Sequence, residues 1–128
     1  MRVDGDVYSP PHAALDRMWE LAELVITHHG GDLRFGRKHR QIFRGAGFVD
    51  ILATASSDSF GTPELTAGFS RYWSDVFMVQ HRPLILAEGW AAAEELDAMV
   101  VALRAWGGGH DSFYLRCRCE AVGRKPEA

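Results

Sequence analysis

Hydrophobic residues between positions 15 and 26 recur at steps of three and four, which is the period of an amphipathic helix. Gly30 and Gly31 follow this stretch and predict the end of that helix. A shorter helix is predicted over residues 37–44, where basic side chains crowd one face and Ile42 and Phe43 occupy the other. The first third of the chain is therefore predicted to be mainly helical.

A second helical region is predicted from Thr62, because Thr is a favourable N-cap and Pro63 suits the first helical position. Large side chains then recur on one side of the helix: Leu65, Phe69, Tyr72, Trp73, Val76 and Phe77. Further helices are predicted over residues 82–88 and 92–106, and the glycines at 107–109 end the last one.

Two strands are predicted, one before and one after this helical region. Residues 48–55 are rich in apolar and β-branched side chains, and residues 112–122 alternate between two faces. One face of the second strand is predicted to be buried: Phe113, Leu115, Cys117, Cys119 and Ala121. Residues 1–11 are predicted to form a loop and residues 56–61 a turn, so the fold class is α/β.

The composition is typical of one globular domain that spans residues 1–128, with 47% hydrophobic and 24% charged residues. The formal net charge of −3 argues against a nucleic-acid-binding surface. No apolar run reaches the ~20 residues of a membrane helix, and no signal peptide is recognisable. We therefore expect a cytoplasmic protein that binds neither nucleic acid nor membranes, and we expect its two cysteines to be buried thiols.

Sequence motifs for catalysis are lacking. His28, His29 and His39 do not have the spacing of metal ligands, so no metal site is expected. No nucleophile elbow is found, and the glycine runs follow helices where a phosphate loop would precede one. The catalytic residues stay unassigned, and whether the chain alone is an enzyme is left open.

Several segments together resemble the class I S-adenosylmethionine-dependent methyltransferases. Residues 36–51, Gly-Arg-Lys-His-Arg-Gln-Ile-Phe-Arg-Gly-Ala-Gly-Phe-Val-Asp-Ile, are similar to that family's G-R-x-L-x-x-L-x-x-A-G-F-x-D-V segment, which contains the last helix before the sixth strand. The closest branch is that of the ubiquinone and menaquinone biosynthesis methyltransferases. Other segments of that family resemble residues 4–6, 59–64, 94–98, 102–106 and 119–126 of this chain.

The resemblance implies a partial Rossmann-like methyltransferase fold, with two C-terminal antiparallel strands and a helical lid inserted between them. In that family the terminal strand lies between the fifth and sixth strands and runs antiparallel to them. The match covers only the C-terminal, substrate-lid half of the family domain. The family's glycine-rich cofactor turn has no counterpart, since no D-x-G-x-G sequence occurs here. The cofactor of the family is S-adenosylmethionine, and we do not expect this chain alone to bind it.

The lid position and the large aromatic residues together predict a substrate pocket. Trp19, Phe69, Tyr72 and Trp73 are expected around a small-molecule substrate between their helices, with His12 and Tyr72 as its polar groups. The alternative is that the same aromatic residues form the hydrophobic core, which their helical spacing also predicts.

Two functions agree with this sequence. The chain is either the lid half of a split or truncated methyltransferase, or a methyltransferase-derived protein that lacks the cofactor site. The second would bind a small molecule or a partner protein, or catalyse a reaction that needs no cofactor. The terminal strand is expected to lack a neighbour on one side, so we predict a homodimer or a partner chain that supplies the missing half.

Overall fold

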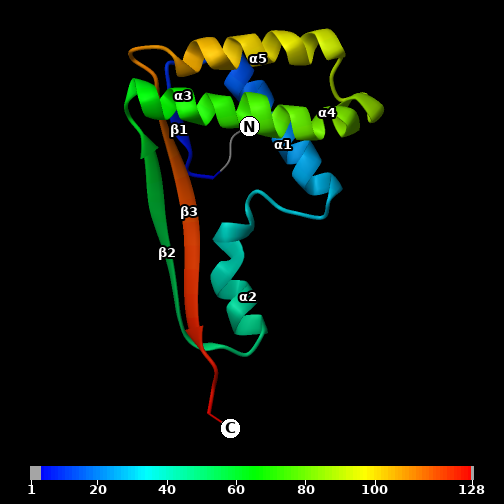
Figure 1. Ribbon diagram of the computed structural model, residues 1–128. Coiled ribbons are helices and arrows are strands. Elements are labelled where there is room, and N and C mark those ends of the chain that lie inside the picture. The colour runs from blue at the N-terminus through cyan, green and yellow to red at the C-terminus, as the bar shows by residue number, and fades with distance from the viewer. Residues whose placement is uncertain (1–3, 128) are drawn as a thin grey trace.

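The computed structural model describes residues 4–127 and has a mixed α/β fold (Figure 1). Its elements, in chain order, are β1 (Val7–Ser9), α1 (Ala13–His28), the 3₁₀ turn η1 (Phe35–Lys38), α2 (His39–Gly45), β2 (Val49–Phe60), α3 (Pro63–Arg71), the π-helical turn η2 (Tyr72–Phe77), α4 (Met78–Ala87), α5 (Ala93–Gly107) and β3 (Phe113–Arg124).

The sheet has three antiparallel strands in the order β1-β3-β2, where two were predicted. The prediction missed β1, because a three-residue strand followed by Pro10 carries little local signal. It forms by pairing with β3 more than 100 residues away, with Val7 opposite Leu115 and Ser9 opposite Phe113. The prediction that β3 lacks a neighbour on one side is therefore wrong over residues 113–115.

β2 is longer than predicted and continues through the segment that was expected to be a turn. Its polar residues remain in the ladder because β2 is an edge strand, so their side chains reach solvent or ion partners on β3. Asp58 accepts hydrogen bonds from Arg116 and Arg118, and Ser56 donates one to Glu120. Cross-strand polar pairs of this kind stabilise a sheet where apolar burial is absent.

The face of β3 that is most deeply buried is also not the predicted one. Tyr114 is completely buried, whereas Phe113 and Leu115 are half-buried and Cys119 is exposed. The strand itself was predicted correctly, but its burial does not alternate regularly, and the sequence pattern did not show which face the helices cover. The helices here cover the Tyr114 face at the start of β3.

The helix starts agree better with the sequence. Thr62 caps α3 by accepting a hydrogen bond from the Leu65 amide, as predicted. The segments α3, η2 and α4 then follow one another without a break, so the helix predicted over residues 82–88 is the end of a longer helical rod. Arg17 joins α1 to α5 by pairing with Glu95, and it joins α1 to the α4–α5 connection by donating a hydrogen bond to the Trp90 carbonyl oxygen.

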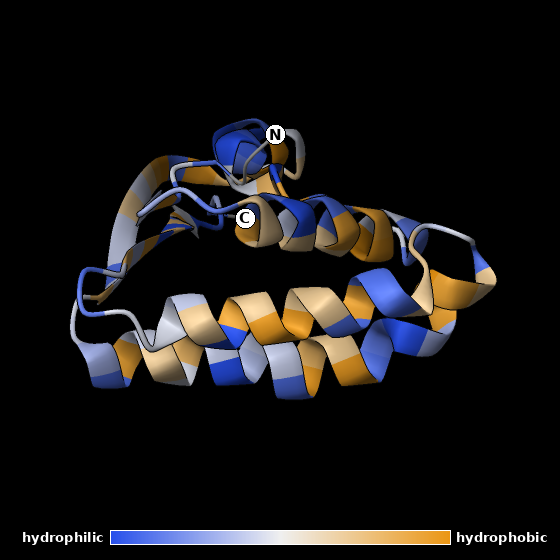
Figure 2. Cartoon of the chain, turned by 90° about the horizontal axis from the view of Figure 1, so that it is seen from above, coloured by the Kyte–Doolittle hydropathy of each residue, from blue (hydrophilic) through white to orange (hydrophobic). Residues whose placement is uncertain are grey.

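The hydrophobic core lies where α1, α3, η2, α4 and α5 gather at one end of the strands (Figure 1). Seen from above, the helices carry both hydrophobic and hydrophilic residues (Figure 2). The amphipathic pattern predicted from the sequence is present in α1 and α3. The most deeply buried large side chains of the core include Leu15, Met18, Leu21, Ile85, Leu96, Leu103 and Tyr114. Within residues 4–127, no helix is long and apolar enough to cross a membrane.

The other end of the strands is covered on one side by η1 and α2 (Figure 1). Close backbone approach occurs there at two glycines. A Cβ on Gly36 would lie 2.5 Å from the Cβ of Cys119, and one on Gly123 would lie 3.0 Å from the Phe43 ring. A side chain at Gly36 would therefore push η1 away from β3, whereas one at Gly123 would need a smaller shift of the Phe43 ring of α2.

Candidate substrate pocket

A pocket of about 280 Å³ lies between α3, η2 and the end of the sheet that bears the core. Its lining residues are Phe60, Glu64, Leu65, Gly68, Phe69, Tyr72, Trp73 and Arg116. Three of them, Phe69, Tyr72 and Trp73, belong to the set that the sequence predicted. The structure thus brings these aromatic residues together around a space open to solvent.

The position of the pocket follows from the short connection between β2 and α3. Only Gly61 and Thr62 separate the last residue of β2 from Pro63, the first residue of α3. Because the Thr62 cap fixes the first turn, α3 starts directly beside Phe60. The rings of Phe60 and Phe69 lie 5.2 Å apart, and both line the pocket.

The two tryptophans predicted for the site have different environments. Trp73 lines the pocket but is only 9% exposed, since its ring packs against Trp19 and Phe77 at 4.7 Å each. Trp19 lies behind Trp73, away from the lining, and its buried indole N–H completes no hydrogen bond within the described part of the chain. The pocket therefore does not lie between α1 and η2, where it was predicted, because Trp19 and Trp73 fill that space as part of the core. It lies on the other side of Trp73, between α3, η2 and the strands.

Tyr72 is the predicted residue that is most available to a ligand. Its side chain is 53% exposed and its ring meets Trp73 edge to face at 5.6 Å. A ring at the mouth of an apolar pocket can stack on a ligand without disturbing the core.

His12, by contrast, lies apart from the pocket. It is the N-cap of α1, where its Nδ1 atom accepts a hydrogen bond of 3.0 Å from the Ala14 amide. An imidazole nitrogen used in this way is an acceptor, so the proton of the neutral ring lies on Nε2. The structure assigns His12 a capping contact and does not bring it to the aromatic residues.

Polar groups at the pocket come from two residues that sequence reasoning did not identify, Glu64 and Arg116. The Arg116 guanidinium lies 5.6 Å from the centre of the Phe60 ring and donates a 2.8 Å hydrogen bond to Asp58. Hydrogen bonds from Arg116 and Arg118 hold the pKa of Asp58 below its usual value. The available signal was strand register, because Arg116 lies two residues after Tyr114 on the same face of β3.

Beneath the pocket, Tyr114 connects the aromatic cluster to a buried carboxylate. Phe69 stacks on the Tyr114 ring at 4.2 Å, and the Tyr114 hydroxyl donates a 2.6 Å hydrogen bond to Asp6. Burial, followed by the nearby Asp6 carboxylate, raises the pKa of Tyr114 far above its ordinary value. The phenol therefore stays protonated and acts as a fixed donor within the core.

This arrangement can bind and shield a ligand, and its lining contains no thiol and no histidine. In residues 4–127 no cluster of three or more His, Cys, Asp or Glu side chains is placed to hold a metal ion. An apolar slot with the charged side chains of Arg116 and Glu64 at its rim fits a flat ring that carries a polar group.

Comparison with known proteins adds no relative: no family model matches the chain, and no curated protein matches it significantly.

Proposed function

We propose that this chain is the substrate-lid part of an S-adenosylmethionine-dependent small-molecule methyltransferase. In this proposal the Phe69, Tyr72 and Trp73 pocket holds the methyl acceptor, and a further polypeptide segment supplies the cofactor-binding groups.

The observation that carries the proposal is the strand order. β3 lies between β1 and β2 and runs antiparallel to both. The sequence resemblance implies this arrangement for the terminal strand between the fifth and sixth strands, with a helical lid inserted before the terminal strand. Here α3, η2, α4 and α5 occupy the connection from β2 to β3. Fold analogy does not establish activity by itself, so the pocket and the strand edge provide separate support.

The pocket supports the proposal because methyl transfer requires an acceptor that is oriented and shielded from water. Aromatic walls at Phe69 and Trp73 exclude water from one side, and the exposed Tyr72 ring can cover the ligand from the other. The lining contains no thiol or imidazole that would compete with the acceptor for the methyl group.

The unpaired side of β3 supports the need for a further segment. β1 pairs with three residues of β3, which leaves nine, from Arg116 to Arg124, without a strand neighbour on that side among residues 4–127. The Cys117 amide on this side donates to Asp6 at 2.9 Å in place of a strand carbonyl. Beyond Cys117, a strand edge that has no strand partner among residues 4–127 can bind an added strand.

Reconstitution tests the proposal. The chain should be mixed with polypeptides from the same source that contain a glycine-rich cofactor turn, and titrated with S-adenosylmethionine in a calorimeter. We expect no micromolar binding by the chain alone and micromolar binding by the mixture. Tight cofactor binding by the chain alone would contradict the proposal. Ligand binding at the aromatic pocket without any gain of cofactor binding would favour the alternative, a methyltransferase-derived small-molecule binder.

A pair of proline variants provides the matched control. The Cys117 amide points away from β2, so by strand alternation the Cys119 amide does too. Ala55 is the partner of Cys119 in the register, and its amide points to the outer edge of β2. Cys119→Pro should abolish assembly with the cofactor half, whereas Ala55→Pro should preserve it. Circular dichroism of both variants shows whether each retains its fold.

A further inference from the structure

A second pocket, separate from the aromatic one, lies on η1 and α2. It encloses about 530 Å³ and is lined by Arg37, Arg40, Gln41, Arg44 and Ile51. Counted from Arg37, the next three of these residues lie three, four and seven positions later, so all four share one face of the helical segment. Ile51 of β2 forms the apolar side of the same pocket.

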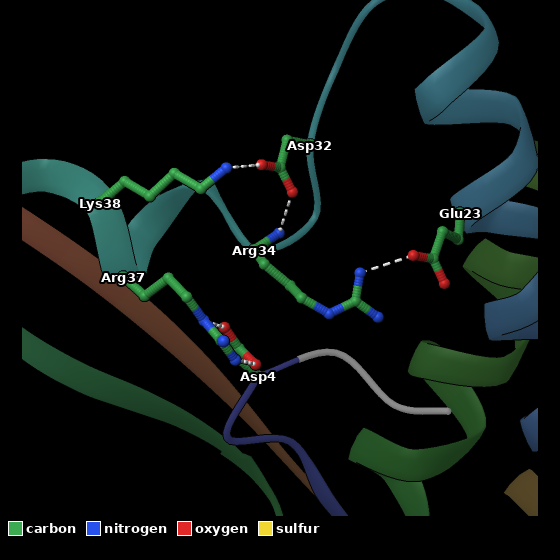
Figure 3. A network of polar contacts seen from close by, with 6 residues as sticks. All are labelled: Asp4, Glu23, Asp32, Arg34, Arg37 and Lys38. Atoms are coloured by element: carbon green, nitrogen blue, oxygen red, sulfur yellow. Dashed lines mark hydrogen bonds and ion pairs between the residues drawn. The ribbon is translucent and has the colours of Figure 1, made fainter. Parts of the chain in front are cut away.

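The charge around this pocket is one-sided. The sequence from position 33 to position 49 contains five basic residues and no Asp or Glu. Three of the five are neutralised by carboxylates from elsewhere (Figure 3). Arg37 forms two hydrogen bonds with Asp4, Lys38 pairs with Asp32 at 2.8 Å, and Arg34 pairs with Glu23 at 2.6 Å.

Arg40 and Arg44 differ from these three in having no ion pair within residues 4–127. Most other arginines there do pair with carboxylates, as Arg82 does with Asp97 and Arg124 with Asp50. Two guanidinium groups four residues apart on one helix repel each other. The helix that carries this repulsion is short, since α2 has only seven residues. An anion placed between them would remove that repulsion.

We propose that this pocket binds the phosphate group of a small phosphorylated molecule. A phosphate monoester carries a charge of about −1.5 to −2 at pH 7, which matches the two unpaired guanidinium groups. An arginine guanidinium group can donate two parallel hydrogen bonds to phosphate oxygens. Gln41, in the same pocket, adds a side-chain amide donor. Ile51 provides an apolar surface for the body of the molecule, so a monoester with an apolar group is the ligand class. The net charge of −3 disfavours a nucleic acid.

Titration of the isotope-labelled chain with phenyl phosphate, followed by NMR, tests this site independently of the proposed function. We expect saturable shifts of the Gln41 and Ile51 amides, with inorganic phosphate binding more weakly than phenyl phosphate. Equal affinity for the two probes would mean that the site takes the free ion, which would overturn the ligand class. No saturable shift with either probe would overturn the site.

Three variants separate the site from nonspecific charge effects. Arg40→Ala combined with Arg44→Ala should weaken phenyl phosphate binding by about tenfold or more, since hydrogen bonds to charged groups are strong. Arg71→Ala is the matched control, because Arg71 is also helical and forms no ion pair within residues 4–127, and it should leave binding unchanged. Ile51→Ala should remove the preference for phenyl phosphate over phosphate. Equal losses in the double variant and in Arg71→Ala would contradict the proposal.

Discussion

The two ends of the β2–β3 ladder have the same hydrogen-bonded pairing but opposite environments. At the start of β3, Tyr114 is opposite Phe60 and is completely buried beneath α1 and α3. Near its end, Val122 is opposite Leu52, and these two apolar side chains are 70% and 63% exposed. Strand pairing thus continues well beyond the hydrophobic core.

The buried end of the ladder is stabilised by packing within residues 4–127, whereas the exposed end has little such packing. The buried end contains the aromatic cluster, the Tyr114–Asp6 hydrogen bond and the candidate pocket. Among residues 4–127, the exposed end has an apolar cross-strand pair on its surface and a β3 edge without a strand partner, and both features favour the binding of another segment. The proposed cofactor half would bind at this exposed end and leave the pocket accessible.

The largest expected effect is the loss of a buried ring at the core end. Tyr114→Ala should lower the free energy of unfolding by about 3–5 kcal/mol, because it leaves a cavity and an unpaired carboxylate. Val122→Ala at the exposed end should change it by less than about 0.5 kcal/mol. Denaturant titration measures both. Similar losses in the two variants would show that both ends are equally buried in solution.

Removing only the Tyr114 hydroxyl sharpens the comparison within the core end. Tyr114→Phe should cost about 1.5–3 kcal/mol, since Asp6 loses a hydrogen bond of 2.6 Å to a buried donor. Tyr72→Phe is the control, because Tyr72 is half exposed. Calorimetric unfolding of the two variants should differ, and an unchanged Tyr114→Phe would mean that the Asp6 contact contributes nothing.

The pocket can be separated from the core by its two neighbouring aromatic residues. With 2-naphthoate as the probe, Tyr72→Ala should weaken binding about two- to tenfold, the usual contribution of one aromatic contact, while stability stays nearly unchanged. Trp73→Ala should instead lower stability by about 3–5 kcal/mol, since that side chain is mostly buried. Fluorescence titration and thermal melting test both. If Tyr72→Ala leaves binding unchanged, the pocket is not the ligand site.

The smallest effect concerns pH and the residue that lies between the two ends. Hydrogen bonds from Arg116 and then Arg118 lower the pKa of Asp58 in the folded chain. A lowered folded pKa adds stability above the ordinary Asp pKa of about 3.9, and this contribution is lost as pH falls through the folded value. Asp58→Asn should therefore be less stable than the unchanged chain at neutral pH, and the difference should shrink below about pH 4. A difference that is constant from pH 7 to pH 3 would contradict this origin.

The sequence predicted those elements whose signals are local. The period of the first helix and the Thr62 cap lie within a few neighbouring residues, and the structure confirms both, together with the β3 strand itself. β1 and the polar half of β2 depend on pairing with a distant strand, so a local pattern could not show them.

The same distinction applies to the candidate site. Helical spacing brought Phe69, Tyr72 and Trp73 together correctly. It could not place Arg116, which reaches the pocket only through strand register, and it could not show that His12 is used as a helix cap.

In the proposed function, another polypeptide segment completes the exposed end of the ladder along β3. Light scattering at micromolar concentration, combined with hydrogen exchange at the Cys119 amide, tests it most directly. We predict association of the purified chain with a second copy or with the cofactor half, and protection of the Cys119 amide only in the associated form. A monodisperse species of 14.3 kDa in which the Cys119 amide is already protected would contradict the claim.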